Sequence, residues 1–267
     1  MQKTFYYIQS TISYTIHGNG QPVILLHGFG EDSSIWNGQI DFLKNHCTLI
    51  IPDLLGSGKS EILNSETVEI TDFANCINAL LEQENIEKCI LLGHSMGGYI
   101  TLAFAEMFPQ KLKAFGLVHS TAFADSAEKK TGRQQGIEMI NEYGAFAFLK
   151  NTIPNLFSKK FKETNADEVE QLIEKGKNFS AEALTQYYTT MMNRPDRTVV
   201  LKDAKVPVLF IIGEEDVAAP LDDLLQQVPL PDISDIHILQ GVGHMGMMEV
   251  PELLNKHLLS FIDSIHK

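Results

Sequence analysis

Apolar runs and polar, helix-like stretches alternate along most of the chain. Alternation of apolar and polar residues at 5–9 and 11–16 predicts two half-exposed antiparallel strands. Later runs are almost continuously apolar, which is typical of strands that are covered on both faces. These runs lie at residues 22–27, 47–51, 88–93, 112–118, 206–212 and 236–239. The pattern therefore predicts eight strands.

The stretches between the buried strands have the spacing of amphipathic helices. In residues 68–81 the apolar side chains Val68, Phe73 and Ile77 recur at helical intervals. Further helices are expected at 33–43, after Ser95, at 221–228 and from Pro251 to residue 265. Alternating strands and helices predict an α/β fold, with a mostly parallel sheet and helices on both of its faces.

One long segment departs from this alternation. From residue 121 to 197 no strand pattern occurs, and helical stretches rich in Lys, Glu and Gln replace it. We therefore expect a core domain made of 1–120 and 198–267, with a helical insertion at 121–197. The apolar residues of the insertion fit a substrate pocket and the insertion's own core equally well.

The sequence Gly93-His94-Ser95-Met96-Gly97 separates a predicted strand from a predicted helix. A serine in this G-x-S-x-G pattern is typical of a nucleophile elbow, a sharp strand-to-helix turn. Glycine is needed two residues before and after the serine, because the backbone closes on itself there and a Cβ would clash. A helix cap would explain Ser95 but neither flanking glycine.

Other polar residues with useful chemistry also follow predicted strands. His27, Asp216 and His244 all lie, like Ser95, just past the carboxyl end of a strand. In open parallel sheets, binding and catalytic sites form at these ends. The four residues are therefore expected to lie near one another.

These motifs resemble the α/β-hydrolase superfamily over nearly the whole chain outside the insertion. The resemblance rests on five segments in an order that the family shares: nucleophile, then acid, then histidine. They are His27-Gly28-Phe29-Gly30, Asp53-Leu-Leu-Gly56-Ser-Gly58-Lys-Ser60, Gly93-His-Ser-Met-Gly97, Gly213-Glu-Glu-Asp216 and Gly243-His244. The resemblance implies an α/β-hydrolase fold with a mostly parallel eight-stranded sheet, in which 121–197 forms a helical cap.

The resemblance also implies a role for each site residue. Ser95 would be the nucleophile, His244 its general base and Asp216 the acid that orients the imidazole. The backbone N–H groups of Phe29 and Met96 would form the oxyanion hole. Alternative acids are Glu214 and Glu215, which adjoin Asp216, and Asp125, which follows an earlier strand where some similar proteins keep their acid.

Several other polar residues are given structural interpretations. His27 is expected to orient the oxyanion loop, and Asp53 to belong to a structural turn, since no phosphate-loop pattern surrounds it. His94 adjoins Ser95 but is expected to point away from it. Four other histidines, His17, His46, His257 and His266, lie in expected turns or helices. No metal-ligand spacing is present, and no metal or other cofactor is expected.

Charge and cysteine content narrow the possible partners and the cellular compartment. The formal net charge of −13 argues against binding to nucleic acid or to an anionic membrane. Cys47, Cys76 and Cys89 lie in apolar contexts and are expected to be free thiols of a reducing compartment. The first residues do not have a signal-peptide pattern, and no apolar run reaches membrane-spanning length. A cytoplasmic protein is expected.

The expected function is hydrolysis of a small to medium carboxylic ester, mainly uncharged and with an apolar acyl or aryl part, through an acyl-enzyme. Serine at the elbow excludes the chemistry of similar dehalogenases and epoxide hydrolases, which use Asp there. Hydrolysis of a lactone or of a carbon–carbon bond by the same residues remains open. So does a small-molecule receptor that retains the triad. The oligomeric state is not predicted.

Overall fold

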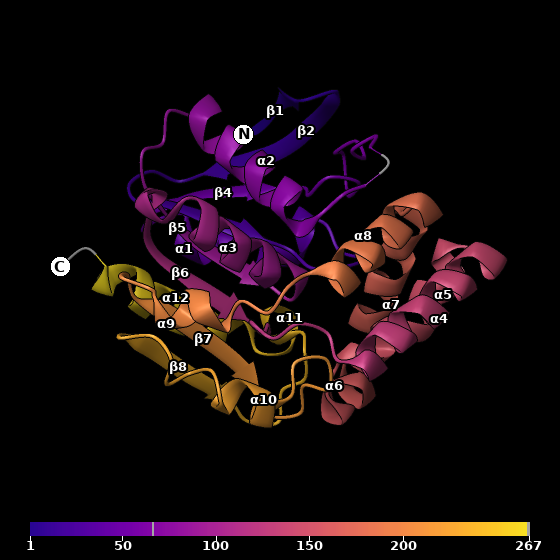
Figure 1. Cartoon of the computed structure of the whole chain (residues 1–267). Coiled ribbons are helices and arrows are strands. Elements are labelled where there is room, and N and C mark those ends of the chain that lie inside the picture. The colour runs from indigo at the N-terminus through magenta and orange to yellow at the C-terminus, as the bar shows by residue number, and fades with distance from the viewer. Residues whose placement is uncertain (66, 266–267) are drawn as a thin grey trace.

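A computed structural model of the chain describes residues 1–65 and 67–265, and its centre is one eight-stranded sheet (Figure 1). The strands lie in the order β1-β2-β4-β3-β5-β6-β7-β8. Pairing is antiparallel from β1 through β2 to β4 and parallel elsewhere. Their bounds are β1 Gln2–Tyr7, β2 Ser10–His17, β3 Pro22–Leu26, β4 Thr48–Pro52, β5 Cys89–His94, β6 Leu112–Val118, β7 Val208–Gly213 and β8 Ser234–Leu239. The predicted mostly parallel sheet is confirmed.

The central strands are buried because both of their faces are covered. Every residue of β5 and of β7 is buried, as the continuous apolar runs predict. Leu25 of β3 pairs with Leu92 of β5, and Leu91 of β5 pairs with Phe115 of β6. At the edge of the sheet, β8 alternates between exposed and partly buried residues.

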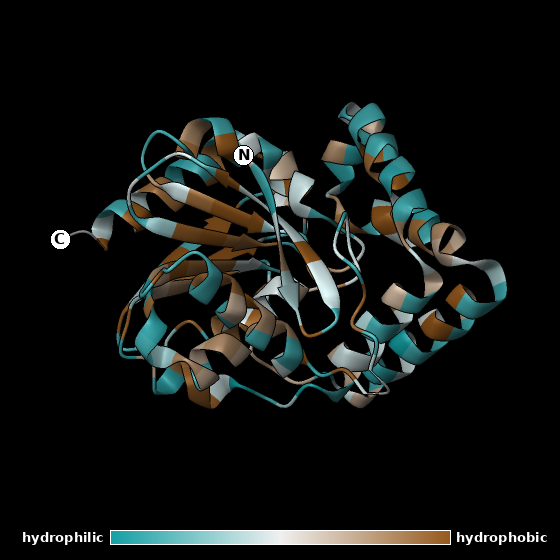
Figure 2. Cartoon of the chain, turned by 90° about the horizontal axis from the view of Figure 1, so that it is seen from above, coloured by the Kyte–Doolittle hydropathy of each residue, from teal (hydrophilic) through white to brown (hydrophobic). Residues whose placement is uncertain are grey.

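Two sets of helices cover the sheet, so the core has three layers (Figures 1 and 2). Helices α2, α3 and α9 pack together on one side, and α1, α11 and α12 pack together on the other. Their bounds are α1 Asn37–Leu43, α2 Ile70–Gln83, α3 Met96–Met107, α9 Thr198–Lys202, α10 Leu221–Leu225, α11 Gly246–Glu249 and α12 Pro251–Ser264. Helix α3 is buried along nearly its whole length, and the central strands between the layers are strongly hydrophobic in Figure 2.

Of the six α-helices between β6 and β7, all but α9 form a separate layer beside the carboxyl ends of the strands (Figure 1). We call residues 127–193 the helical segment. It contains α4 Ala127–Tyr143, α5 Ala145–Thr152, α6 Lys159–Thr164, α7 Ala166–Lys175 and α8 Ala181–Asn193. Its hydrophobic residues turn inward, and Phe148, Leu184 and Tyr187 are buried.

Some local expectations were displaced by a few residues. The first strand ends at Tyr7 because Ile8 adopts a left-handed φ of 56°, so the chain turns before 9. The helix expected at 221–228 ends at Leu225, and α9 forms where no helix was predicted. The first and last residues of a helix or strand depend on tertiary contacts, which the periodicity of the sequence does not indicate.

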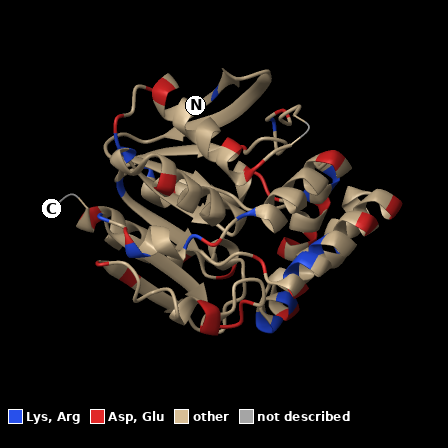
Figure 3. Ribbon diagram, viewed as in Figure 1, with Lys and Arg blue, Asp and Glu red and all other residues tan. Residues whose placement is uncertain are grey.

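Acidic residues are distributed over both the core and the helical segment (Figure 3). None of the described helices is both long enough and apolar enough to cross a bilayer. His266 lies outside the described residues.

Candidate active site

Ser95 occupies the sharp turn between β5 and α3. Its φ of 51° and ψ of −116° lie outside the usual regions for a residue with a side chain, which costs about 1–3 kcal/mol. A Cβ on Gly93 would lie 2.1 Å from the carbonyl oxygen of Gly97. The backbone therefore closes on itself around Ser95, as the two flanking glycines predicted. The serine itself is half-buried.

Asp216 and His244 meet beside this turn. Nδ1 of His244 lies 2.8 Å from Oδ2 of Asp216, and both side chains are buried. Asp216 follows β7, and its other oxygen accepts hydrogen bonds from the backbone N–H groups of Ala218 and Ala219, at 2.8 and 2.9 Å. A Cβ on Gly213 would lie 2.1 Å from the carbonyl oxygen of Gly243, so the two loops that carry these side chains touch through their backbones.

The paired side chains shift each other's pKa in opposite directions. Burial alone would raise the pKa of Asp216, but His244 and His119 outweigh burial and hold the carboxyl well below its usual range. Burial alone would lower the pKa of His244, but the Asp216 carboxylate outweighs it and raises that pKa. Asp216 is therefore ionised at neutral pH and orients the His244 ring through Nδ1.

A second buried histidine shares the same carboxylate oxygen. Nδ1 of His119 lies 3.3 Å from Oδ2 of Asp216, and its Nε2 is buried without a hydrogen-bond partner among the described residues. Burial lowers the pKa of His119 to about 4, so the ring is neutral near pH 7. A neutral ring at this distance donates its Nδ1 proton to Asp216. No sequence motif had marked His119.

His94 supports the loop that carries His244. Its Nδ1 lies 2.9 Å from Oε2 of Glu31, and its Nε2 lies 3.0 Å from the backbone carbonyl of His244. The ring thus bridges the Glu31 carboxylate and the backbone of His244. Burial would raise the pKa of Glu31, but His94 outweighs it and keeps the carboxyl ionised. Sequence analysis missed Glu31 altogether.

The loop after β3 lies directly against Ser95. A Cβ on Gly28 would lie 3.0 Å from Cβ of Ser95, and the backbone N–H of Gly28 donates to Glu31 at 2.7 Å. No described residue accepts a hydrogen bond from the backbone N–H of Phe29 or of Met96. Met96 is the first residue of α3, where helix geometry leaves N–H groups without an intrahelical acceptor.

His27 holds the loop after β3 in place through hydrogen bonds at both ring nitrogens. Its Nδ1 donates to the carbonyl of Gly28 at 2.9 Å, and its Nε2 accepts from the backbone N–H of Leu54 and from the hydroxyl of Ser57. Asp53 accepts from the backbone N–H groups of Ser33 and Lys59 at 2.9 Å each. His27 thus has the orienting role, and Asp53 the turn role, that their sequence context indicated.

The helical segment contacts the site through aromatic side chains and through backbone. Phe29 stacks on Tyr188 of α8 with ring centroids 4.3 Å apart, and its edge meets Phe148 of α5. The backbone N–H of His244 donates to the carbonyl of Leu156 at 2.7 Å. Part of the segment's apolar set therefore faces the site and part forms its own core.

The alternative acids lie away from His244. Asp125 is paired with Arg133 and Arg194. Glu214 accepts from the backbone N–H of Gly241 at 2.8 Å, and both Glu214 and Glu215 are exposed. Only Asp216 among these four carboxylates is hydrogen-bonded to His244.

One group of described residues could offer several ligands to a metal ion: His119, Asp216 and His244. Their ligand atoms lie within 4.8 Å of one another. Nδ1 of each histidine is directed at Asp216, so a metal there would have to displace protons that already make hydrogen bonds. The hydrogen bonds account for the arrangement.

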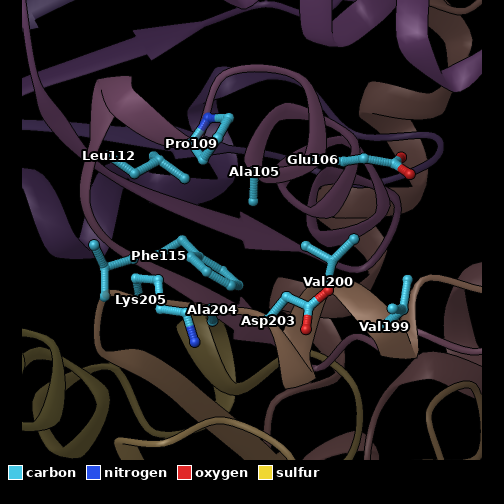
Figure 4. A pocket seen from close by; sticks show the side chains of 11 residues that line it. Ala105, Glu106, Pro109, Leu112, Phe115, Val199, Val200, Asp203, Ala204 and Lys205 are labelled. Atoms are coloured by element: carbon cyan, nitrogen blue, oxygen red, sulfur yellow. The ribbon is translucent and has the colours of Figure 1, made fainter.

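A cavity of about 310 Å³ lies elsewhere, between the carboxyl end of α3, the start of β6 and α9 (Figure 4). Its lining includes Leu112, Phe115 and Val200, with Glu106, Asp203 and Lys205 as charged members. Leu112 begins β6, so this cavity lies at the end of the strand opposite to Ser95. It offers neither a serine nor a histidine.

Comparison with known proteins identifies the fold. A family model described as the alpha/beta hydrolase fold matches residues 21–136. The solved structure of a thermophilic esterase from Thermogutta terrifontis, with malate bound, superposes with a TM-score of 0.94 over 100% of both chains, at 24% identity. The chain has the α/β-hydrolase fold.

Two other similar proteins extend the comparison of this α/β hydrolase. A pimeloyl-[acyl-carrier protein] methyl ester esterase from Wigglesworthia glossinidia brevipalpis is 28% identical over 262 residues, covering 93% of this chain and 96% of the relative. The enol-lactonase from Burkholderia xenovorans has a TM-score of 0.90 and 20% identity over 98% of this chain and 100% of the lactonase. The structural likenesses establish the fold.

Proposed function

We propose that this α/β hydrolase cleaves carboxylic esters through a Ser95–His244–Asp216 triad and a covalent acyl-enzyme. The observation that carries the proposal is the pairing of a strained serine turn with a buried, hydrogen-bonded His244–Asp216 pair. Holding Ser95 at a positive φ costs free energy that a serine serving only as a helix cap would not require. The esterase among its sequence relatives supports the same chemistry.

In the first half of the reaction, Ser95 would attack the carbonyl carbon of the ester. His244 would accept the hydroxyl proton at Nε2, while Asp216 stabilises the imidazolium through Nδ1. The negative charge on the tetrahedral intermediate would be bound by the free N–H groups of Phe29 and Met96. His244 would then return its proton to the departing alcohol, leaving an acyl group on Ser95.

In the second half, water would repeat the same sequence of proton transfers. His244 takes a proton from water as the water attacks the acyl-enzyme, and returns it to Ser95 as the carboxylic acid leaves. The Glu31–His94 pair would hold the backbone of His244 in place during both halves. We further propose that 121–197 acts as a cap, because its aromatic residues stack on Phe29 beside the proposed oxyanion hole.

The proposal is tested with p-nitrophenyl esters from acetate to octanoate. The wild-type protein should turn them over with an optimum chain length, and Ser95→Ala should lose that turnover by about 10,000-fold or more. An exposed serine on α12 provides the matched control, Ser264→Ala, which should keep full activity. Labelling by a fluorophosphonate, followed by peptide mass mapping, should modify Ser95 alone.

Other results of these assays would contradict the proposed nucleophile or indicate a different function. Turnover that survives Ser95→Ala would remove the nucleophile from the proposal. A lactone is a cyclic ester that the same steps would open, so lactones and vinylogous diketo acids belong in the substrate panel. Binding without turnover of any of them would instead indicate a receptor.

A further inference from the structure

Two arginines and one aspartate form a buried charge cluster where the helical segment meets the core. Nε of Arg133 in α4 donates to Oδ2 of Asp125 at 2.6 Å, and Nη1 of Arg194 lies 2.8 Å from Oδ1. Burial alone would raise the pKa of Asp125, but the two guanidinium groups outweigh it and keep the carboxyl ionised. The cluster therefore holds two positive charges and one negative charge.

This local excess of positive charge is unusual in a chain whose formal net charge is −13. Charges taken out of water are costly unless they are paired. Arg194 gains compensation from the ring of Tyr99, which lies 3.8 Å from its guanidinium carbon, and among the described carboxylates it pairs with Asp125 alone. An added anion would neutralise the remaining charge.

The two arginines differ in how fully their donors are used. Arg194 donates to the backbone carbonyls of Met191 and Phe123 at 2.7 and 2.9 Å, and 3% of its side chain is exposed. Arg133 uses Nε and Nη2 on Asp125, and no described residue accepts a hydrogen bond from its Nη1. Its side chain is 19% exposed. Arg133 therefore presents a free guanidinium edge, whereas Arg194 serves as a structural link.

Two lines of contact connect the cluster to the surroundings of Ser95. The guanidinium carbon of Arg133 lies 5.2 Å from the ring centroid of Tyr188, whose ring stacks on Phe29 in the loop beside the serine. Arg194, which shares Asp125 with Arg133, covers Tyr99, four residues after Ser95 in α3. Four residues of helix rise about 6 Å, so Tyr99 lies about one helical turn from the serine.

We propose that Arg133 binds a carboxylate on the substrate, so that this site prefers esters whose acyl chain ends in a negative charge. The inference rests on the proposed ester hydrolysis and names the class of ester. A planar guanidinium with two neighbouring N–H groups matches the two oxygens of a carboxylate, and such charge-assisted bonds are strong. The stacked rings of Phe29 and Tyr188 would flank the methylene groups between the ester and the charge.

The test compares charged and neutral esters of similar length. Monomethyl glutarate, adipate and pimelate are assayed by proton release against methyl pentanoate, hexanoate and heptanoate. The wild-type protein should prefer at least one half-ester by about 10-fold or more in kcat/KM. Arg133→Gln should lower the ratio of charged to neutral activity by about 10- to 100-fold, mainly through KM. Arg133→Lys should retain part of the preference.

Lys130→Gln provides the matched control. Lys130 lies one turn before Arg133 on α4, is exposed, and loses the same charge on substitution. It should leave the ratio unchanged, because an exposed charge is screened by solvent. A fall in the ratio for both variants would show a general charge effect and would overturn the specific role of Arg133.

The outcomes separate this inference from the proposed function. If neutral esters are cleaved by wild type and not by Ser95→Ala, but Arg133→Gln leaves the ratio unchanged, only the carboxylate site is wrong. If no ester is cleaved at all, the proposed ester hydrolysis is wrong. A binding measurement then tests the carboxylate site at Arg133 separately. Calorimetry of monomethyl adipate with Ser95→Ala should then show binding that Arg133→Gln weakens. Equal binding, or none, would overturn the carboxylate site.

Discussion

The turn around Ser95 and the helical segment beside it are built from different kinds of contact. At the turn, an added Cβ on Gly93 would meet backbone at 2.1 Å. In the helical segment, an added Cβ on Gly132 would meet nothing within 4 Å, and contact with the site combines the Phe29–Tyr188 stack with one backbone hydrogen bond, from His244 to Leu156. Backbone contacts leave no room for adjustment, whereas side chains can repack.

This difference suggests a division of work between the two regions. Positions that must hold atoms for proton transfer are fixed by the core backbone, at the loops after β5 and β7. In the proposed function, positions that select a substrate would be side chains of the helical segment, such as Arg133 and Tyr188. Substitutions in the first region should change the rate for every ester. Those in the second should change which ester is preferred.

The largest effect is expected from Asp216→Asn. The asparagine can keep the oxygen that accepts from Ala218 and Ala219, but its amide N–H₂ would then face Nδ1 of His244 and favour the wrong tautomer. We expect kcat to fall by about 10,000-fold for all esters. Steady-state kinetics across the ester series measures this, with Glu214→Gln as the neighbouring control. A loss confined to some chain lengths would contradict the division of work.

Gly93→Ala and Gly132→Ala compare the two regions directly. The first should destabilise the fold by about 3 kcal/mol or more, because Cβ and the carbonyl of Gly97 cannot both be accommodated. The second should stabilise it by about 0.5–1 kcal/mol, because alanine is the better helix former and Gly132 lies within exposed α4. Urea unfolding gives both free energies. Similar changes in the free energy of unfolding for the two variants would contradict the proposed difference between the turn around Ser95 and the helical segment.

The smallest effect is expected from substituting His119, the second histidine that hydrogen-bonds to Asp216. His244 must be neutral to accept the serine proton, and its pKa is raised, so wild-type kcat/KM should fall as pH decreases through a value above about 6.5. His119→Leu removes a donor from Asp216, strengthens its pull on the His244 proton and should move this acid limb to higher pH. We expect activity at pH 6, relative to pH 8, to drop by about 3- to 10-fold.

His119→Asn serves as the rescue variant. Its amide can donate in place of Nδ1, and asparagine tolerates the left-handed φ of 50° at this position. The pH profile of kcat/KM should therefore stay close to that of the wild type. If His119→Leu lowers only the melting temperature and leaves the profile unchanged, His119 is a packing residue without influence on His244.

Much of the fold was predictable because its signals are local. Continuous apolar runs indicated β3 to β7, because a strand that is covered on both faces is apolar at every position instead of alternating with polar residues. The spacing of Gly93, Ser95 and Gly97 indicated the turn, because the clash that excludes Cβ arises between residues four apart in the chain. The order of Ser95, Asp216 and His244 at strand ends then indicated where the site would form.

Other features were decided only by the tertiary structure. The pairs Glu31–His94 and His119–Asp216 join residues 63 and 97 positions apart, and nothing in the sequence around Glu31 or His119 indicates these partners. The same holds for Arg133, which lies among mostly exposed polar residues of α4. A side chain's burial, its partners and its pKa depend on which distant segments pack around it. Periodicity and motifs therefore determined the scaffold and the location of Ser95, Asp216 and His244, and packing alone determined the charges and hydrogen bonds that surround them.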